Sequence, residues 1–175
     1  MLIFLQDAFE AINNFFIKGG PVLYVIAATT FIMWVMILDK YLYLRFSYKN
    51  DFSKVLNTWK SRSEHKSWNA HAIREKLISE TQEKINKNIP VIKTLIALCP
   101  LLGLLGTVTG MIEVFTALSI TGGGDAKSMA GGVSRATIPT MAGMVAALSG
   151  VFANTFVTQL AEKENNLTEE HLTFE

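Results

Sequence analysis

Three long uncharged stretches dominate this 175-residue sequence and limit what it can fold into. They cover residues 19–38, 94–112 and 136–161, and none of them contains Asp, Glu, Lys or Arg. The hydrocarbon core of a bilayer is about 30 Å thick, and a helix of about 20 apolar residues crosses it. A helix buried in a soluble domain rarely stays uncharged over that length. The sequence therefore predicts an all-α membrane protein with three transmembrane helices.

The distribution of basic residues predicts the orientation of these helices. Residues 39–93 hold 12 of the 16 Lys and Arg residues, whereas Lys18 is alone before the first stretch. Between the second and third stretches lie only Lys127 and, at the edge, Arg135. Because cytoplasmic loops are enriched in Lys and Arg, residues 39–93 are expected in the cytoplasm, with the N-terminus outside and the C-terminus cytoplasmic. The first span is expected to act as its own insertion signal, since acids precede it.

The composition argues against several other classes of protein. A net charge of +1 does not suit a strongly basic nucleic-acid binder, and one Cys excludes a disulfide framework. With only three His residues, we expect no metal site and no cofactor. The sequence also lacks HExxH, Gly-x-Ser-x-Gly and Walker motifs, so we do not expect an enzyme.

Local patterns divide the chain into seven expected segments. Gly19-Gly20-Pro21 is expected to end an amphipathic helix and begin the first span. Two helices are expected in the cytoplasmic segment, with a break near 61–67, and Asn88-Ile89-Pro90 marks a start or kink for the second span. The segments are an interfacial helix (1–18), the first span (19–38), a cytoplasmic helical segment (39–93), the second span (94–118), a Gly-rich periplasmic loop (119–134), the third span (135–161) and a cytoplasmic tail (162–175).

Small residues recur at steps of three and four in the second and third spans. Such stripes let neighbouring backbones approach closely, and packing alone is the simpler interpretation for any single Gly. The bulky faces are then left for lipid or neighbouring subunits. The stripes comprise Cys99, Gly103, Gly106, Gly110, Glu113 and Ala117 in the second span, and Ala136, Thr140, Gly143, Ala147, Gly150 and Asn154 in the third.

Polar residues near these stripes are candidates for a functional path. A Thr in a helix can simply bond to the carbonyl one turn back, which would make Thr107 and Thr140 inert. Their shared setting beside the small stripes instead favours a narrow polar path that both line. Asn154 lies deeper toward the cytoplasmic end of the third span.

Glu113 is the acid embedded in the second-span pattern, near its outer end. It could be an interfacial acid, pair with Arg135 at the start of the third span, or relay protons directly. These alternatives stay open from the sequence. No span carries an ionisable Asp, Glu, Lys or His near its middle. The chain alone therefore lacks an obvious protonatable relay within the membrane.

Two motifs resemble those of a known family. CPLLGLLGTVTGMIEVF (99–115) resembles the second-span signature of the ExbB/TolQ/MotA proton-channel family, and ATIPTMAGMVAALSGVFAN (136–154) resembles its third span. Three spans fit ExbB and TolQ better than MotA, which has four. The chain is most similar to a short ExbB.

The resemblance implies a subunit of the bacterial inner membrane that forms a homopentamer around an ExbD-like single-span partner. The partner would carry the essential aspartate, and proton flow would drive TonB-dependent uptake of iron–siderophore complexes, haem or vitamin B12. The family's pore threonines fall on Thr107 and Thr140. The matching pore-helix positions are Pro100, Gly103, Gly106, Gly110, Gly143, Ala147 and Gly150. Arg135 stands where the family often has glutamate.

Two alternatives remain beside this interpretation. A TolQ-like subunit that energises the Tol–Pal envelope system would have the same architecture and a different client. A structural scaffold would use the small stripes only to hold an oligomer together, and it would carry no proton current.

Overall fold

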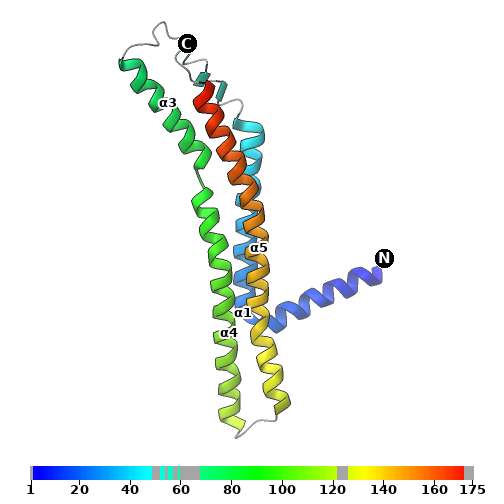
Figure 1. Ribbon diagram of the computed structural model, residues 1–175. Helices are drawn as coiled ribbons and strands as arrows, with labels where there is room; N and C mark the ends of the chain where they lie inside the picture. The colour runs from blue at the N-terminus through cyan, green and yellow to red at the C-terminus, as the bar shows by residue number, and fades with distance from the viewer. Residues whose placement is uncertain are drawn as a thin grey trace. The chain divides into compact units, whose positions relative to one another are not determined.

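The computed structural model describes residues 2–48, 52–53, 55–56, 59, 68–121 and 126–171. Its regular elements in that part of the chain are all helical, which confirms the expected all-α class. They are α1 (Leu2–Leu42), a π-helical turn η1 (Tyr43–Ser47), α3 (Trp68–Asn86), α4 (Ile89–Thr121) and α5 (Ala126–His171) (Figure 1). The break expected near 61–67 lies outside the described residues.

Three helical stretches in the described chain are long and apolar enough to cross a membrane. They lie within Phe9–Phe46, His71–Ile120 and Met129–Thr168. Many of their large apolar side chains do not pack within the chain; Leu101, for example, is 62 % exposed and Val145 is 68 % exposed. Apolar surface of this extent suits contact with lipid or with other membrane helices. The prediction of three helices that fit transmembrane spans is therefore confirmed.

The prediction of a loop over residues 119–134 is wrong for most of that segment. Helix α4 continues to Thr121 and α5 already begins at Ala126, so Gly131 and Gly132 lie inside a helix. A Cβ on Gly132 would overlap the side chain of Val114, so α5 packs tightly on α4 at this point. This packing offsets the helix cost of glycine, which is about 1 kcal/mol per residue. Residues 162–171 of the expected tail are helical as well.

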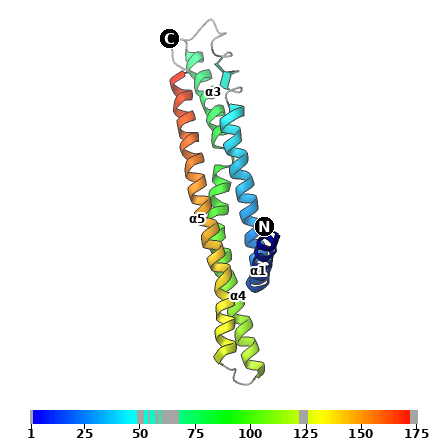
Figure 2. The same cartoon turned by 90° about the vertical axis from the view of Figure 1, so that its right-hand side faces the viewer.

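The contacts divide the chain into two compact units, one of residues 1–33 and 94–150, the other of residues 34–93 and 151–175. In the first unit, α4 and α5 lie side by side in both views (Figures 1 and 2). Apolar side chains of α1 spaced by three and seven residues complete its interior. The buried residues of this unit include Leu23, Ile26 and Met33 of α1, Ile96 and Cys99 of α4, and Ala136 and Ala147 of α5.

The break expected at Gly19-Gly20-Pro21 is found at Gly20. Its φ of 68° and ψ of −169° are non-helical, and a side chain at this φ would strain the backbone. Pro21 follows directly, at a position where a helix start tolerates proline. The helix before Gly20 consequently turns away from the bundle of the first unit (Figure 1).

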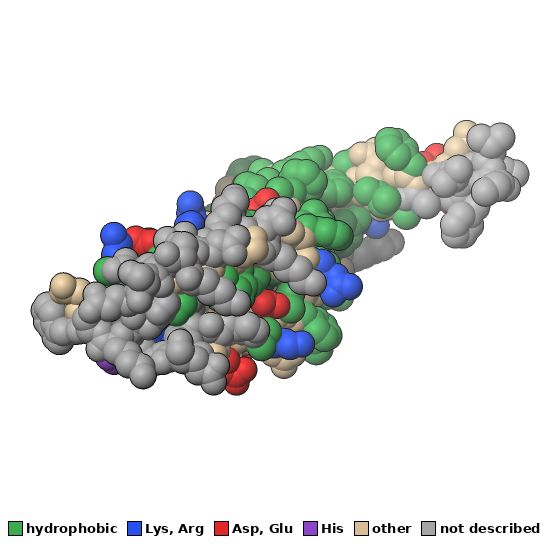
Figure 3. Space-filling view, turned by 90° about the horizontal axis from the view of Figure 1, so that it is seen from above, with side chains coloured by type: hydrophobic (Ala, Val, Ile, Leu, Met, Phe, Trp, Pro, Cys, Tyr) green, Lys and Arg blue, Asp and Glu red, His purple; other side chains and the backbone are tan. Residues whose placement is uncertain are grey.

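In the second unit, Lys40 is almost fully buried. Its Nζ donates a 3.0 Å hydrogen bond to the carbonyl of Lys84 and lies 5.0 Å from the centre of the Tyr43 ring. Lys84 belongs to the last turn of α3, where carbonyls lack helical partners and cations are favoured. Asn88 follows this turn with a φ of 71°, and α4 begins at the next residue. Seen from above, the described surface of the molecule carries both basic and acidic side chains (Figure 3).

Tyr48 connects η1 to the end of α5 within the second unit. Its hydroxyl lies 2.6 Å from that of Thr168, and Thr168 donates its own proton to the carbonyl of Glu164. The Tyr48 hydroxyl also lies 3.5 Å from the carbonyl of Glu164, so its one proton is shared between Thr168 and this carbonyl. Burial raises the pKa of the Tyr48 hydroxyl above its ordinary value.

Replacement of Tyr48 by Phe should lower the free energy of unfolding by about 1 kcal/mol, because the buried Thr168 oxygen loses its donor. The thermal unfolding midpoint in detergent measures the effect. Tyr24→Phe is the matched control, since Tyr24 is 58 % exposed. Equal midpoints for both variants would show that the Tyr48–Thr168 bond contributes nothing to stability.

Candidate functional site

The small residues of α4 and α5 face each other in antiparallel register. A Cβ added to Gly103 would lie 2.9 Å from the Cα of Thr140, and one on Gly110 would lie 2.8 Å from the Cβ of Ala136. Between these two contacts, Gly106 lies directly against the ring of Pro139. The glycines therefore permit backbone contact between the two spans of one chain.

Thr140 forms a hydrogen bond across this interface. Its Oγ1 donates to the carbonyl oxygen of Gly103 at 2.8 Å. Absence of a Cβ on Gly103 is what lets the two backbones come this close. A hydroxyl has one proton and two lone pairs, so Thr140 Oγ1 can still accept a hydrogen bond.

Thr107 lies one turn after Gly103 on α4 and is half-buried. Its hydroxyl donates to the carbonyl of Leu104 in its own helix at 2.8 Å. Thr109 also bonds within α4, to the carbonyls of Leu105 and Gly106. Thr107 therefore forms the hydrogen bond within its own helix that was the simpler interpretation of the sequence. Its oxygen can still accept a hydrogen bond from another donor.

The remaining stripe residues serve different contacts. Gly143 faces the backbone of Cys99, whereas a Cβ on Gly150 would lie 2.6 Å from the sulfur of Met33 in α1. Ala147 is buried between these two positions, and Pro100 is half-buried within α4. The third-span stripe thus packs on α4 along its length, and at Gly150 it packs on Met33 of α1 and Ile96 of α4 together.

Asn154 lies in the second unit and is 8 % exposed. Its Oδ1 has no hydrogen-bond partner, and neither has the Oγ1 of Thr158, one turn further along α5. Unpaired buried oxygens of this kind are favourable sites for internal water.

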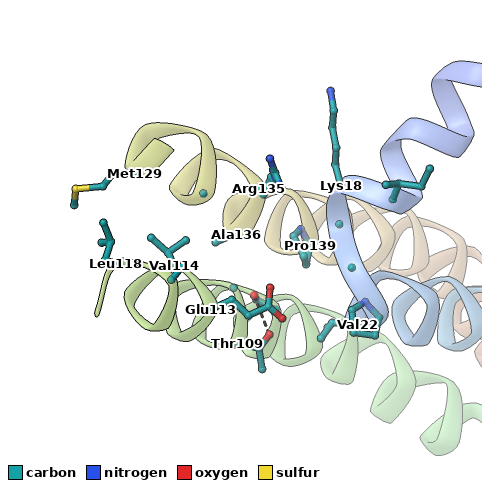
Figure 4. A pocket seen from close by; sticks show the side chains of 18 residues that line it. Lys18, Val22, Thr109, Glu113, Val114, Leu118, Met129, Arg135, Ala136 and Pro139 are labelled. Atoms are coloured by element: carbon teal, nitrogen blue, oxygen red, sulfur yellow. Dashed lines mark hydrogen bonds between the residues drawn. The ribbon is translucent and has the colours of Figure 1, made fainter. Parts of the chain in front are cut away.

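A cavity of about 940 Å³ lies in the first unit, between the turn at Gly20, the C-terminal part of α4 and the N-terminal part of α5 (Figure 4). Glu113 lines it from α4, Arg135 from α5 and Lys18 from the helix before Gly20. Within the described chain, Glu113 and Arg135 form no ion pair with each other. The structure thus brings the two residues to one cavity without the direct pair considered from the sequence.

Sequence reasoning did not single out two residues of this region, Lys18 and Pro139. Pro139 contacts Gly106 and lines the cavity. As a proline, it also removes the amide that would pair with the carbonyl of Arg135 in a regular helix. Pro139 could have been identified from the sequence, because it lies next to Thr140 in the third-span motif.

These features define a multi-pass helical membrane protein whose second and third spans pack through small residues. Residues 46–170 match the MotA/TolQ/ExbB proton channel family, and the chain belongs to it. The matched range includes both motifs and every candidate residue from Pro100 to Asn154.

Two curated relatives are named as biopolymer transport proteins. The chain is 47 % identical over 68 residues to putative biopolymer transport protein ExbB-like 1 of Synechocystis, an alignment that covers 37 % of this chain and 27 % of that protein. It is 33 % identical over 69 residues to the biopolymer transport protein ExbB of Helicobacter pylori, covering 39 % of this chain and 48 % of the relative. The chain thus matches less than half the length of these relatives.

The close approach at Gly103 predicts a strong effect of one added methyl group. Gly103→Ala should lower the free energy of unfolding by about 1–3 kcal/mol, because the Cβ meets the backbone of Thr140 rather than a flexible side chain. Thermal unfolding in detergent measures it.

Gly131→Ala is the matched control. A Cβ there meets no atom within 4 Å, so helix propensity should leave stability unchanged or raise it. If both variants were equally stable, the contact at Gly103 would not limit the approach of α4 and α5.

Proposed function

We propose that this chain is an ExbB-like subunit of a proton-driven motor in the bacterial inner membrane, which energises TonB-dependent uptake across the outer membrane. Membership of the MotA/TolQ/ExbB proton channel family carries the proposal, and relatives named as biopolymer transport proteins support it. Iron–siderophore complexes, haem and vitamin B12 are the proposed cargo classes.

The chain requires a partner to move protons. Its uncharged stretches contain no carboxylate at mid-span, so it cannot itself supply the titrating group there. We propose that a homopentamer encloses an ExbD-like single-span subunit whose carboxylate titrates, and that a TonB-like transducer receives the motion. The exposed apolar faces of α4 and α5 leave ample surface for such assembly.

Thr107 and Thr140 are the proposed lining of the proton path. Both hydroxyl protons are donated to backbone carbonyls, so each oxygen is left as an acceptor. An acceptor matches the protonated carboxylic acid of a partner better than its carboxylate, which has no proton to donate. The two threonines would therefore stabilise the neutral, proton-loaded state of the partner.

Thr107→Val and Thr140→Val should each abolish energised siderophore uptake, while the complex still assembles. Thr107→Val is the cleaner test, because it removes only a bond within α4. Thr140→Val also removes the bond between α4 and α5, which is worth about 1 kcal/mol. Iron-limited growth and recovery of the complex from membranes are measured together.

Thr116→Val and Thr155→Val are matched controls, since both hydroxyls bond within their own helix and both side chains are exposed. Thr140→Ser should restore uptake because it keeps the hydroxyl. Normal uptake with Thr107 and Thr140 both replaced by Val would eliminate the proposed path.

The proposed orientation places residues 1–18 and 119–134 outside and residues 39–93 and 162–175 in the cytoplasm. In a Cys99→Ala background, a membrane-impermeant maleimide should label Glu10→Cys in intact spheroplasts and Lys76→Cys only after lysis. Both parent side chains are exposed, so labelling reports the side of the membrane. The opposite pattern would reverse the topology.

A TolQ-like role is the second candidate, because the matched family includes TolQ. Deletion of the gene would then cause detergent sensitivity with normal growth under iron limitation. The ExbB-like role gives the reverse pair of phenotypes.

A further inference from the structure

We propose that the cavity at the outer end of α4 and α5 binds the headgroup of one phospholipid of the phosphoethanolamine type. It takes the phosphate at Arg135 and Lys18 and the ammonium at Glu113. Lipid binding at this site and the proposed role in proton transport do not depend on each other.

The cavity has the size and the lining of a ligand site. Its volume of about 940 Å³ lies within the range of about 300–1,000 Å³ that is usual for small-molecule sites. Most of its wall is apolar or small, and the charged side chains are few. Among its described residues the apolar lining comprises Ile17, Pro21, Val22, Val114, Leu118, Met129 and Pro139.

Its position suits a lipid rather than a soluble ligand. The cavity lies at the turn where the first helix leaves the bundle at Gly20, and the exposed apolar faces of the spans begin there. A headgroup in the cavity could therefore keep its acyl chains against those faces. Basic pockets between membrane helices are known to bind lipid headgroups in this way.

The charges specify the type of headgroup. Arg135 offers a planar guanidinium that suits phosphate. Lys18 adds a second cation at the edge of the cavity; its extended side chain points away from the other lining side chains and would turn inward to reach a phosphate (Figure 4). Glu113 faces the same cavity from the opposite helix and does not pair with Arg135. A cation and an anion held apart in one cavity complement a zwitterion, whereas a purely anionic headgroup would leave Glu113 opposed by a like charge.

The carbonyl of Arg135, a residue of the cavity lining, is the second acceptor proposed for the ammonium. Pro139 lies four residues later and has no amide proton, so it cannot form the usual helical bond to this carbonyl. An ammonium has three protons to donate, and Glu113 alone does not use them all.

The test measures lipid retained by the purified complex. The complex is extracted in mild detergent, stripped of lipid, and incubated with vesicles of either phosphatidylethanolamine or phosphatidylglycerol. Retained lipid per chain is then quantified after detergent washing. The expected result is about one phosphatidylethanolamine per chain above the level of phosphatidylglycerol.

Charge variants test separately the proposed contacts to the phosphate and to the ammonium of the headgroup. Arg135→Gln should reduce retention of both lipids several-fold, whereas Glu113→Gln should remove the preference for phosphatidylethanolamine and keep binding of phosphatidylglycerol. Lys163→Gln and Glu10→Gln are the controls, since both residues are exposed and neither lines the cavity. Unchanged retention in both cavity variants overturns the proposal.

A bulky replacement tests the cavity without changing charge. Ala117 is exposed and lines the cavity, so Ala117→Phe should displace the lipid. Ala130→Phe is equally exposed but lies outside the lining and should have no effect. If Ala117→Phe retains lipid fully, or if a second copy of the chain covers the cavity in cross-linking from Ala117→Cys, the site is not a lipid site.

Discussion

The backbone contact between α4 and α5 is the constraint on which the first unit depends. Without a Cβ at Gly103, the two helices approach until a Thr140 hydroxyl reaches a backbone carbonyl across the interface. Lipid is as apolar as Leu, so close packing and such bonds, rather than a hydrophobic force, hold membrane helices together. The glycines therefore determine the position of Thr140 against α4 and the bulky faces left outside.

The membrane spans could be predicted because a helix of 19 or more residues without a charge is rare outside the bilayer. The helical structure of most of the segment between the second and third spans could not be predicted. The pair Gly131-Gly132 indicates a loop only when no other helix packs on it. Gly132 lies against Val114, and that contact is invisible in a linear pattern. For the same reason the burial of Lys40 against the carbonyl of Lys84 was not foreseen, since 44 residues separate the two.

The candidate residues were predictable as a set, and their separate roles were not. Stripes at steps of three and four identified most small residues of the interface, though not Gly132. They did not distinguish Gly103, which faces α5, from Gly150, which lies against both α1 and α4. That distinction depends on which helix lies opposite each turn. The sequence left open an ion pair between Glu113 and Arg135. The structure places both described residues at one cavity, and they form no ion pair with each other.

The two kinds of polar group in the first unit imply a division of roles. The hydroxyls of Thr107 and Thr140 donate hydrogen bonds to backbone carbonyls, so toward another group they act as hydrogen-bond acceptors. They are neutral and neither store nor release charge. The charged groups of the cavity lie toward the C-terminal end of α4 and the N-terminal end of α5, away from the uncharged middle of the spans. Under the proposed function, such a chain would provide a fixed polar wall and leave titration to its partner. Its contribution to proton transport would then be geometric, and α4–α5 packing would keep that geometry constant.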